Sequence, residues 1–179
     1  ALLGGETFYT WQRGIPEVRE ALAHYHNRHF GTGLTGQNFL VTGSGMQSIQ
    51  LALHAVAGNG DEVIYLTPAW PNFAAAAGIA GAKAVSVDLD SGPTGWTFDV
   101  SRFEQAVNGK TKAIFINSPS NPTGWTASAE ELRAILEIAR KYGLWIIADE
   151  IYSLFYYSGE RSASFLYVME TDDKIIFVN

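Results

Sequence analysis

The stretch Leu144-Trp145-Ile146-Ile147-Ala148-Asp149-Glu150-Ile151-Tyr152 decides the fold. Its first five residues are all apolar, which predicts a strand buried on both faces, and a carboxylate follows where that strand ends. The amphipathic segment 128–142 comes directly before it and predicts a helix. A further apolar run, 112–117, predicts another strand ahead of that helix. This strand–helix–strand succession predicts an α/β sheet covered on both faces.

The same alternation continues outward along the chain. We expect helices from Gly14 onward, after Gly43-Ser44-Gly45, and over 74–81 and 99–107, and strands over 38–42, 61–66, 84–87 and 174–178. The expected apolar faces of the first two helices are Val18, Leu22 and Tyr25, then Ile49, Leu51, Leu53 and Val56. Residues 91–95 are predicted to form a loop. The sequence therefore predicts an α/β fold, a three-layer sandwich with a mostly parallel sheet.

Composition narrows the range of partners. The 179 residues carry a net charge of -6, and the scattered Lys and Arg argue against nucleic-acid binding. No cysteine is present, which excludes disulfides and thiolate metal sites and is compatible with a cytoplasmic location. No metal site, membrane span or signal peptide is predicted. Because the chain begins at Ala1 and stops within a strand-like run, we expect it to be a fragment of a longer protein.

Two glycines and a serine connect a predicted strand to a predicted helix at Gly43-Ser44-Gly45. Backbone N–H groups at such a helix start attract an anion, and phosphate is the natural guest. A plain tight turn is the alternative. A dinucleotide-binding fingerprint is not met, because Ser48 stands where its third glycine would fall.

Two further segments follow predicted strands. Trp70, between Pro68 and Pro71, offers a ring face to a planar heterocycle, although a core or interface tryptophan is the alternative. The loop 117–124 contains two prolines, two asparagines and a glycine, which fix the direction of the Asn121 amide. A loop constrained to this degree favours a functional role.

Asp149 ends a strand that is otherwise wholly apolar. A buried carboxylate is costly unless it meets a cation or a strong donor, and a protonated pyridine nitrogen is such a donor. Tyr152, three residues later, is placed to direct its hydroxyl at a ring oxygen. The alternative is a structural aspartate that caps the next segment.

Taken together, these motifs resemble the class I/II aminotransferases of fold type I, which depend on pyridoxal phosphate (PLP). The resemblance extends from Tyr9 to Asn179 and is most specific at Asn-Pro-Thr-Gly (121–124) and Asp-Glu-Ile-Tyr (149–152). The segments 14–22 and 60–63 also look like the family. The resemblance implies that residues 1–179 form part of the PLP-binding large domain. It also implies a leading helix region from Tyr9 to Arg28 and an α/β core over 39–179, without the rest of the large domain or the small domain.

The resemblance implies a role for each of eight site residues. The phosphate would be bound by Ser44, Gly45 and Met46, largely through backbone N–H groups. Trp70 would stack on the pyridine ring, Asn121 and Tyr152 would bind its ring oxygen, and Asp149 would bind its nitrogen. Tyr9 would reach the phosphate of a neighbouring subunit, so that a homodimer is expected.

The catalytic residue that the family requires is not among these positions. Its Schiff-base lysine is expected beyond Asn179, and the arginine that binds the substrate carboxylate is expected later still. The five lysines present, Lys83, Lys110, Lys112, Lys141 and Lys174, match no such segment and are predicted to lie at the surface. His24, His26 and His29 on the first helix are also predicted at the surface, and His54 lies in no motif. The chain alone is therefore expected to be inactive.

For the complete protein, the resemblance implies transfer of an amino group between an amino acid and a 2-oxo acid. A carbon–sulfur β-lyase or related synthase of the same fold remains open, because the residues that select the reaction are mostly absent. A PLP-binding effector domain of a transcriptional regulator is a further alternative. The remaining alternative, a nucleotide-binding α/β domain, is disfavoured by the unmet dinucleotide fingerprint.

Overall fold

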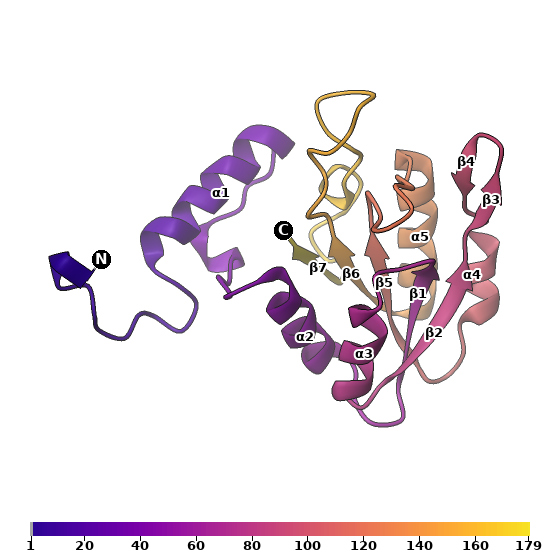
Figure 1. Ribbon diagram of the computed structural model, residues 1–179, viewed down its shortest axis with the longest axis horizontal. Coiled ribbons are helices and arrows are strands. Elements are labelled where there is room, and N and C mark those ends of the chain that lie inside the picture. The colour runs from indigo at the N-terminus through magenta and orange to yellow at the C-terminus, as the bar shows by residue number, and fades with distance from the viewer. Residues whose placement is uncertain (1) are drawn as a thin grey trace. The chain divides into compact units, whose positions relative to one another are not determined.

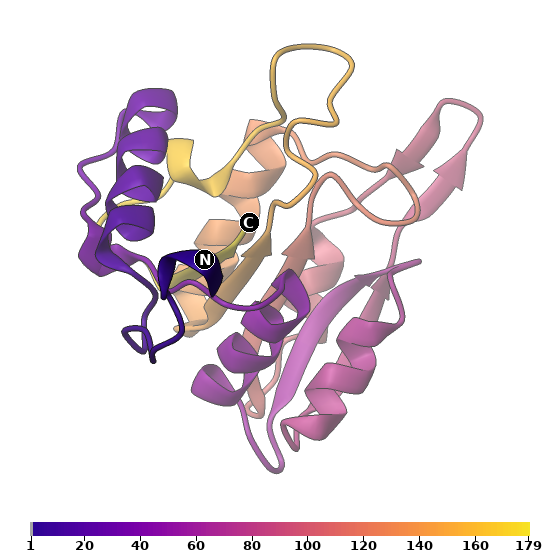
Figure 2. The same ribbon diagram turned by 60° about the vertical axis from the view of Figure 1, so that its left-hand side comes forward.

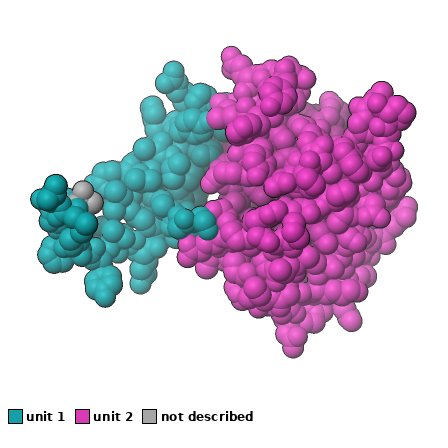
Figure 3. Space-filling view, in the orientation of Figure 1, with its two compact units in different colours: residues 1–44 teal, residues 45–179 magenta. Residues whose placement is uncertain are grey.

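The computed structural model describes residues 2–179 and divides the chain into two compact units. The first comprises residues 1–44 and the second residues 45–179, and Figure 3 colours them separately. Within residues 2–179, none of the helices combines the length and the apolar character that crossing a membrane requires.

The first unit is built around one long helix. It contains the short 3-10 turn η1 (Leu2–Gly4), the helix α1 (Pro16–Phe30) and a second 3-10 turn η2 (Gly36–Asn38). α1 starts with proline at its first position, where no N–H is needed, and Gly31, with φ 68°, caps its carboxyl end. Side-chain hydrogen bonds between Thr35 and Asn38 close η2 in a capping box.

The buried face of α1 differs from the expected one. Val18 and Tyr25 are exposed, and the helix buries Ala23 and His26 instead. The prediction of a surface His26 is therefore wrong: its Nδ1 lies 2.8 Å from the carbonyl oxygen of Leu22, and its ring contacts Phe39. Satisfying one ring nitrogen on the helix backbone allows a histidine to be buried among aromatic rings.

The strand predicted at 38–42 is also wrong. Asn38 closes η2, and residues 39–42 belong to no strand of the described chain. The amide of Val41 donates to the carbonyl of Arg13 at 3.1 Å, a lone contact that no ladder continues. The backbone of Phe39 is extended, with φ -115° and ψ 139°, but a strand needs a neighbouring strand to pair with.

The second unit is an alternation of helices and strands (Figure 1). In chain order it contains α2 (Gly45–Val56), β1 (Glu62–Thr67), α3 (Asn72–Ile79), β2 (Lys83–Asp88), β3 (Asp90–Gly92), β4 (Gly95–Thr97), α4 (Ser101–Ala106), β5 (Thr111–Asn117), α5 (Ala129–Tyr142), β6 (Trp145–Asp149), η3 (Phe165–Tyr167) and β7 (Ile175–Val178). Five strands form one sheet in the order β2-β1-β5-β6-β7, and every neighbouring pair is parallel. The predicted α/β fold with a parallel sheet is confirmed.

Helices cover both faces of this sheet, and each face has its own core (Figure 2). α2 and α3 pack on one face, over residues that include Val63, Ala113 and Ile147. α4 and α5 pack on the other face, over Ile64, Ile114 and Ile146. Neighbouring residues of a strand point to opposite faces, so strands this apolar supply both cores at once.

Two details depart from the expected pattern. The predicted loop 91–95 instead includes the end of β3 and the start of β4, which form a small antiparallel hairpin with residues 93–94 at its turn, and each of these strands is only three residues long. Leu51, expected on the buried face of α2, is exposed, whereas Ile49 and Leu53 are buried. Leu51 lies two positions from each of these buried residues, and positions two apart on a helix do not face the same side.

The N-terminus of α5 provides a test of local stability. The Ser128 hydroxyl accepts a hydrogen bond from the Glu131 amide at 3.1 Å, and the Glu131 carboxylate accepts one from the Ser128 amide at 2.7 Å. Replacing Ser128 with alanine should lower the free energy of unfolding by about 1 kcal/mol, because an amide of the first turn loses its acceptor. Denaturant titration measures the change. Ser158→Ala, at an exposed loop position, is the control, and equal midpoints for the two variants would contradict the prediction.

Candidate functional site

A pocket lies at the carboxyl edge of the sheet, where the strand order reverses between β1 and β5. Chain order runs outward from β1 to β2 on one side and through β5, β6 and β7 on the other. Ligands of open α/β sheets bind in the crevice at such a point. The pocket has a volume of about 280 Å³ and is lined by Gly45, Met46, Ile49, Leu66, Ala69, Trp70, Phe73, Phe115, Asn117, Ser120, Asn121, Asp149, Ile151, Tyr152 and Val178.

Asp149 provides the carboxylate of this pocket. It ends β6 and is 7% exposed, and its side chain accepts one long hydrogen bond, from the Ile151 amide at 3.4 Å. Burial raises the pKa of Asp149 to about 6, and this single hydrogen bond lowers it only in part. The carboxylate therefore retains capacity to accept a hydrogen bond from a cationic donor.

Asn121 and Tyr152 bring two polar groups together in the same pocket. The Asn121 side-chain nitrogen lies 3.5 Å from the Tyr152 hydroxyl, although the residues come from different loops. The loop of Asn121 follows β5, and Tyr152 follows β6, the neighbouring strand. Both groups can donate to an oxygen placed between them.

Trp70 and the start of α2 complete the pocket. Trp70 follows β1 and lines the pocket with 37% of its surface exposed, so part of the residue is accessible to a ligand. Gly45 and Met46 are the first two residues of α2. The N–H groups of a first helical turn have no acceptor within their own helix, and the helix dipole adds positive potential there.

The structure brings six of the eight predicted site residues to one pocket: Gly45, Met46, Trp70, Asn121, Asp149 and Tyr152. Ser44 and Tyr9 belong to the first unit. Ser44 precedes Gly45 directly in the chain, and Tyr9 is fully exposed within a segment that contains no helix or strand. Their contribution to the site stays a prediction.

Sequence reasoning missed the pocket residues that depend on strand register. Asn117, the last residue of β5, pairs in register with Asp149 and lies in the pocket. Ser120 and the apolar residues Ile49, Phe73, Phe115 and Val178 were not identified either. For Asn117 a signal was present, since it is the polar residue that ends an apolar strand, as Asp149 is.

Glu150 was also missed, and its buried carboxyl lies outside the pocket lining. It is 4% exposed, and it accepts hydrogen bonds from the Ser164 hydroxyl at 2.6 Å and the Phe165 amide at 3.0 Å. Burial, together with the neighbouring Asp149, raises the pKa of Glu150 to about 7, although both hydrogen bonds oppose the rise. Glu150 thus ties the end of β6 to the start of η3.

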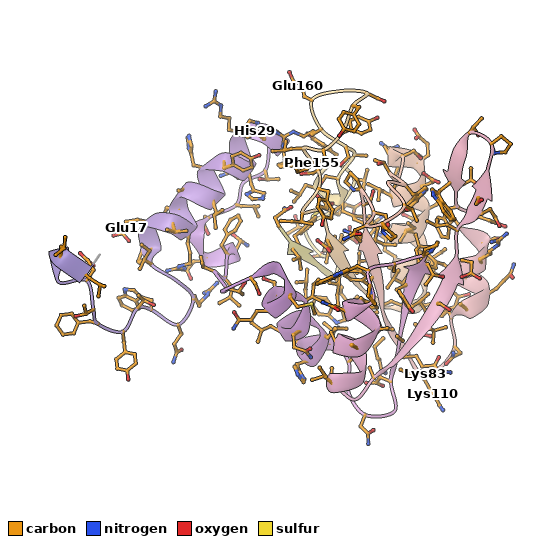
Figure 4. The ribbon with its side chains drawn as sticks, in the orientation of Figure 1. Glu17, His29, Lys83, Lys110, Phe155 and Glu160 are labelled. Atoms are coloured by element: carbon orange, nitrogen blue, oxygen red, sulfur yellow. The ribbon has the colours of Figure 1, made fainter. Side chains whose placement is uncertain are left out.

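The lysines of the chain lie away from this pocket. All five are exposed, as predicted. Lys83 begins β2 and Lys110 precedes β5, so both lie at the amino edge of the sheet, opposite the pocket (Figure 4). Neither they nor the other three line the pocket.

The donor set of the pocket suits a planar, cationic heterocycle that carries an anionic substituent. A buried carboxylate is matched to a protonated ring nitrogen, the amide and phenol to a ring oxygen, and an aromatic side chain to the ring face. The start of α2 is matched to a phosphate. Pyridoxal phosphate has each of these groups, and the pocket residues fit it.

Comparison with known proteins identifies relatives that are all described as aminotransferases. A sequence model of the family described as aminotransferase class I and II matches residues 2–179. An aspartate/prephenate aminotransferase of Thermus thermophilus is 37% identical over 162 residues, which are 90% of this chain and 42% of the relative. An aspartate aminotransferase of Pyrococcus horikoshii is 35% identical over 161 residues, 90% of this chain and 41% of the relative.

Solved structures give the same result. An aspartate aminotransferase of Thermotoga maritima superposes with a TM-score of 0.91 at 33% identity, covering 98% of this chain and 46% of that chain. An N-succinyldiaminopimelate aminotransferase of Mycobacterium tuberculosis has a TM-score of 0.91 at 32% identity, with the same coverage of 98% and 46%. The chain thus spans less than half the length of these relatives.

Proposed function

Because the chain belongs to the aminotransferase class I and II family, we propose that the complete protein transfers an amino group between an amino acid and a 2-oxo acid, with PLP as cofactor. The observation that carries the proposal is the buried Asp149 carboxylate in a pocket with Asn121, Tyr152 and Trp70. The proposal concerns the complete protein, because the chain spans less than half the length of its relatives.

In this proposal each pocket residue holds a defined part of the cofactor. The Asp149 carboxylate accepts from the protonated ring nitrogen and keeps it protonated. Asn121 and Tyr152 donate to the ring oxygen, and Trp70 packs on the ring face. Gly45 and Met46, together with Ser44 ahead of them, direct N–H groups to the phosphate. When bound, the cofactor supplies an electron sink for the negative charge left when the amino acid loses its Cα proton.

The residues of this chain stabilise that charge by their fixed positions. The carboxylate of Asp149 is held in a buried site, where an ionic contact is stronger than in water. The two donors near the ring oxygen are held by separate loops of one sheet edge, so they need little rearrangement during the reaction. The proton itself is moved by a lysine expected outside this chain.

Assembly and location belong to the same proposal. Residues 1–179 form part of a PLP-binding large domain, with a leading region over 9–28 and an α/β core over 39–179. The complete protein is a cytoplasmic homodimer in which Tyr9 reaches the phosphate bound by the partner subunit. The exposure of Tyr9 supports this role, because an aromatic side chain without cover within its own chain is available to a partner.

Aspartate is the first amino donor to assay, because several of the relatives are named aspartate aminotransferases. The test uses the complete reading frame, loaded with PLP, reduced with borohydride and digested for peptide mapping. We expect the label on one lysine that follows Asn179 in the sequence, and amino transfer from aspartate to 2-oxoglutarate. Release of ammonia and a thiol from a thioether amino acid, without transfer, would instead support a β-lyase. Absence of any labelled lysine would overturn the proposal.

A further inference from the structure

Asn117 forms two hydrogen bonds that join the separate halves of the pocket. It ends β5 and stands in register with Asp149 on β6. Its side-chain nitrogen donates to the backbone carbonyl of Asp149 at 3.2 Å, and its side-chain oxygen accepts from the backbone amide of Asn121 at 2.8 Å. One side-chain amide group therefore contacts both the residue that the proposed function assigns to the ring nitrogen and the residue that it assigns to the ring oxygen.

The loop that carries Asn121 has few other attachments. Pro119 and Pro122 have no N–H to donate. The Ser120 amide donates to Trp125 and the Gly124 amide donates to Ser120, so both bonds stay within the loop and its continuation. The Ser118 amide donates to the Asp149 carbonyl at 3.1 Å and connects the start of the loop to β6. Within the part of the chain that the structure describes, the bond from the Asn121 backbone amide to the Asn117 side chain connects the tip of the loop to β5, and the Asn121 side chain lies 3.5 Å from the Tyr152 hydroxyl of the loop after β6.

We propose that Asn117 is a positioning residue. By binding the backbone amide of Asn121, it fixes the side-chain amide of Asn121 relative to the Asp149 carboxylate. This inference rests on the proposed function, since it concerns how the chain aligns its groups with the cofactor. The position needs an amide, because one side chain must donate to a carbonyl and accept from an N–H at the same time. Aspartate keeps the size and the acceptor but loses the donor, and alanine loses both.

The experiment compares Asn117→Ala and Asn117→Asp in the complete protein. For Asn117→Ala we expect the PLP dissociation constant to rise about tenfold, the cost of losing one aligned hydrogen bond. We also expect kcat to fall by a larger factor than KM rises. The absorption of the bound cofactor changes with pH, and we expect the midpoint of this change to shift. Asn117→Asp retains the acceptor for the Asn121 backbone amide, so its affinity for PLP should lie between those of wild type and Asn117→Ala. We expect it to shift the midpoint of the absorption change as well.

Asn108→Ala is the matched control. Asn108 precedes β5 at the opposite edge of the sheet, and its side-chain nitrogen donates to the Glu62 carboxylate at 2.7 Å. Asn108→Ala loses a comparable hydrogen bond. This variant should therefore lower the stability of the protein without changing the PLP dissociation constant or the pH dependence of the cofactor absorption. A positioning role for Asn117 is supported only if its variants change both quantities and Asn108→Ala changes neither.

A double-mutant cycle with Asn121→Ala provides the deciding measurement. If Asn117 acts through Asn121, removing the Asn121 side chain should weaken PLP binding much less in the Asn117→Ala background than in wild type. Additive effects, or a dissociation constant unchanged by both Asn117 variants, would overturn the inference. If Asn117→Ala does not fold, the same cycle is run with Asn117→Leu, which keeps the approximate size of the side chain and removes both hydrogen bonds.

The inference and the proposed function fail in different ways. If the wild-type protein does not bind PLP, the proposed function is wrong, and hydrogen exchange of the Asn121 backbone amide then decides the role of Asn117. Exchange about tenfold faster in Asn117→Ala would support the positioning role, and an unchanged rate would overturn it.

Discussion

Replacing Asp149 with asparagine should lower the rate of amino transfer by the complete enzyme by about a hundredfold or more. Asparagine keeps the size and one acceptor oxygen of the side chain but carries no negative charge. In the proposed function that charge holds the proton on the ring nitrogen, and removing one fixed electrostatic contact from a buried site commonly costs about 10²–10³ in rate. Steady-state kinetics at saturating PLP measures the loss.

The same variant should also change how cofactor binding depends on pH. Burial raises the pKa of Asp149 from its ordinary value of 3.8 to about 6. Only the ionised carboxylate pairs with a protonated ring nitrogen, so the affinity of wild type for PLP should fall as the pH drops below about 6. In Asp149→Asn this dependence should be absent. Equilibrium dialysis from pH 5 to pH 8 measures both proteins.

Asp172→Asn is the control for these experiments, because Asp172 is exposed and does not line the pocket. It removes the same charge and should leave rate and affinity unchanged. If Asp149→Asn retained more than about a tenth of the wild-type rate, the assignment of Asp149 to the ring nitrogen would be wrong.

Replacing Glu150 with glutamine should stabilise the cofactor-free protein above neutral pH. Burial raises the pKa of Glu150 from 4.5 to about 7, so the folded state binds its proton more tightly than the unfolded state does. This contribution to stability is complete below about pH 4.5 and is lost as the pH rises through about 7. A change of one in pKa corresponds to about 1.4 kcal/mol, which gives a loss of about 3 kcal/mol.

Glutamine has no such loss. Its oxygen can accept from the Phe165 amide, and its nitrogen can donate to the Ser164 hydroxyl, so the contacts seen for Glu150 can be kept. The gain for Glu150→Gln should be about 3 kcal/mol at pH 8 and close to zero at pH 4.5. Denaturant titration at the two pH values measures the difference in unfolding free energy.

Glu160→Gln serves as the matched control, since Glu160 lies in the segment that follows β6 and is exposed (Figure 4). It should have little effect at either pH. A Glu150→Gln variant less stable than wild type at pH 8 would mean that the ionised carboxylate is favourable in its site, contrary to the raised pKa.

The sequence predicted most of the sheet because both faces of its strands are buried. The apolar run 144–148 and its neighbours need no tertiary information to be read as strands, and five of the six predicted strands form the sheet. The strand predicted at 38–42 was wrong because strand formation also depends on a partner strand. Its apolar residues match a strand locally, but pairing is a property of neighbouring segments, which a local pattern does not contain.

The candidate site was predictable where polar residues end apolar strands. Trp70, Asn121, Asp149 and Tyr152 follow strand ends, and parallel strands bring such ends to one edge. Asn117 also ends an apolar strand, but its two bonds could not be predicted, because they depend on the register between β5 and β6 and on the path of a loop. The burial of Glu150 likewise depends on Ser164 and Phe165, fourteen and fifteen residues away in the sequence.

The division of the core by the sheet has a consequence for evolution and engineering. The apolar lining of the pocket comes mainly from one core: Met46, Ile49, Phe73, Phe115 and Val178 belong to the cluster beneath α2 and α3. Substitutions in that cluster therefore alter ligand fit and folding together, so adaptive change there is pleiotropic. The cluster beneath α4 and α5 contributes only Leu66 to the lining, and it can accumulate neutral or compensatory substitutions with little effect on the ligand.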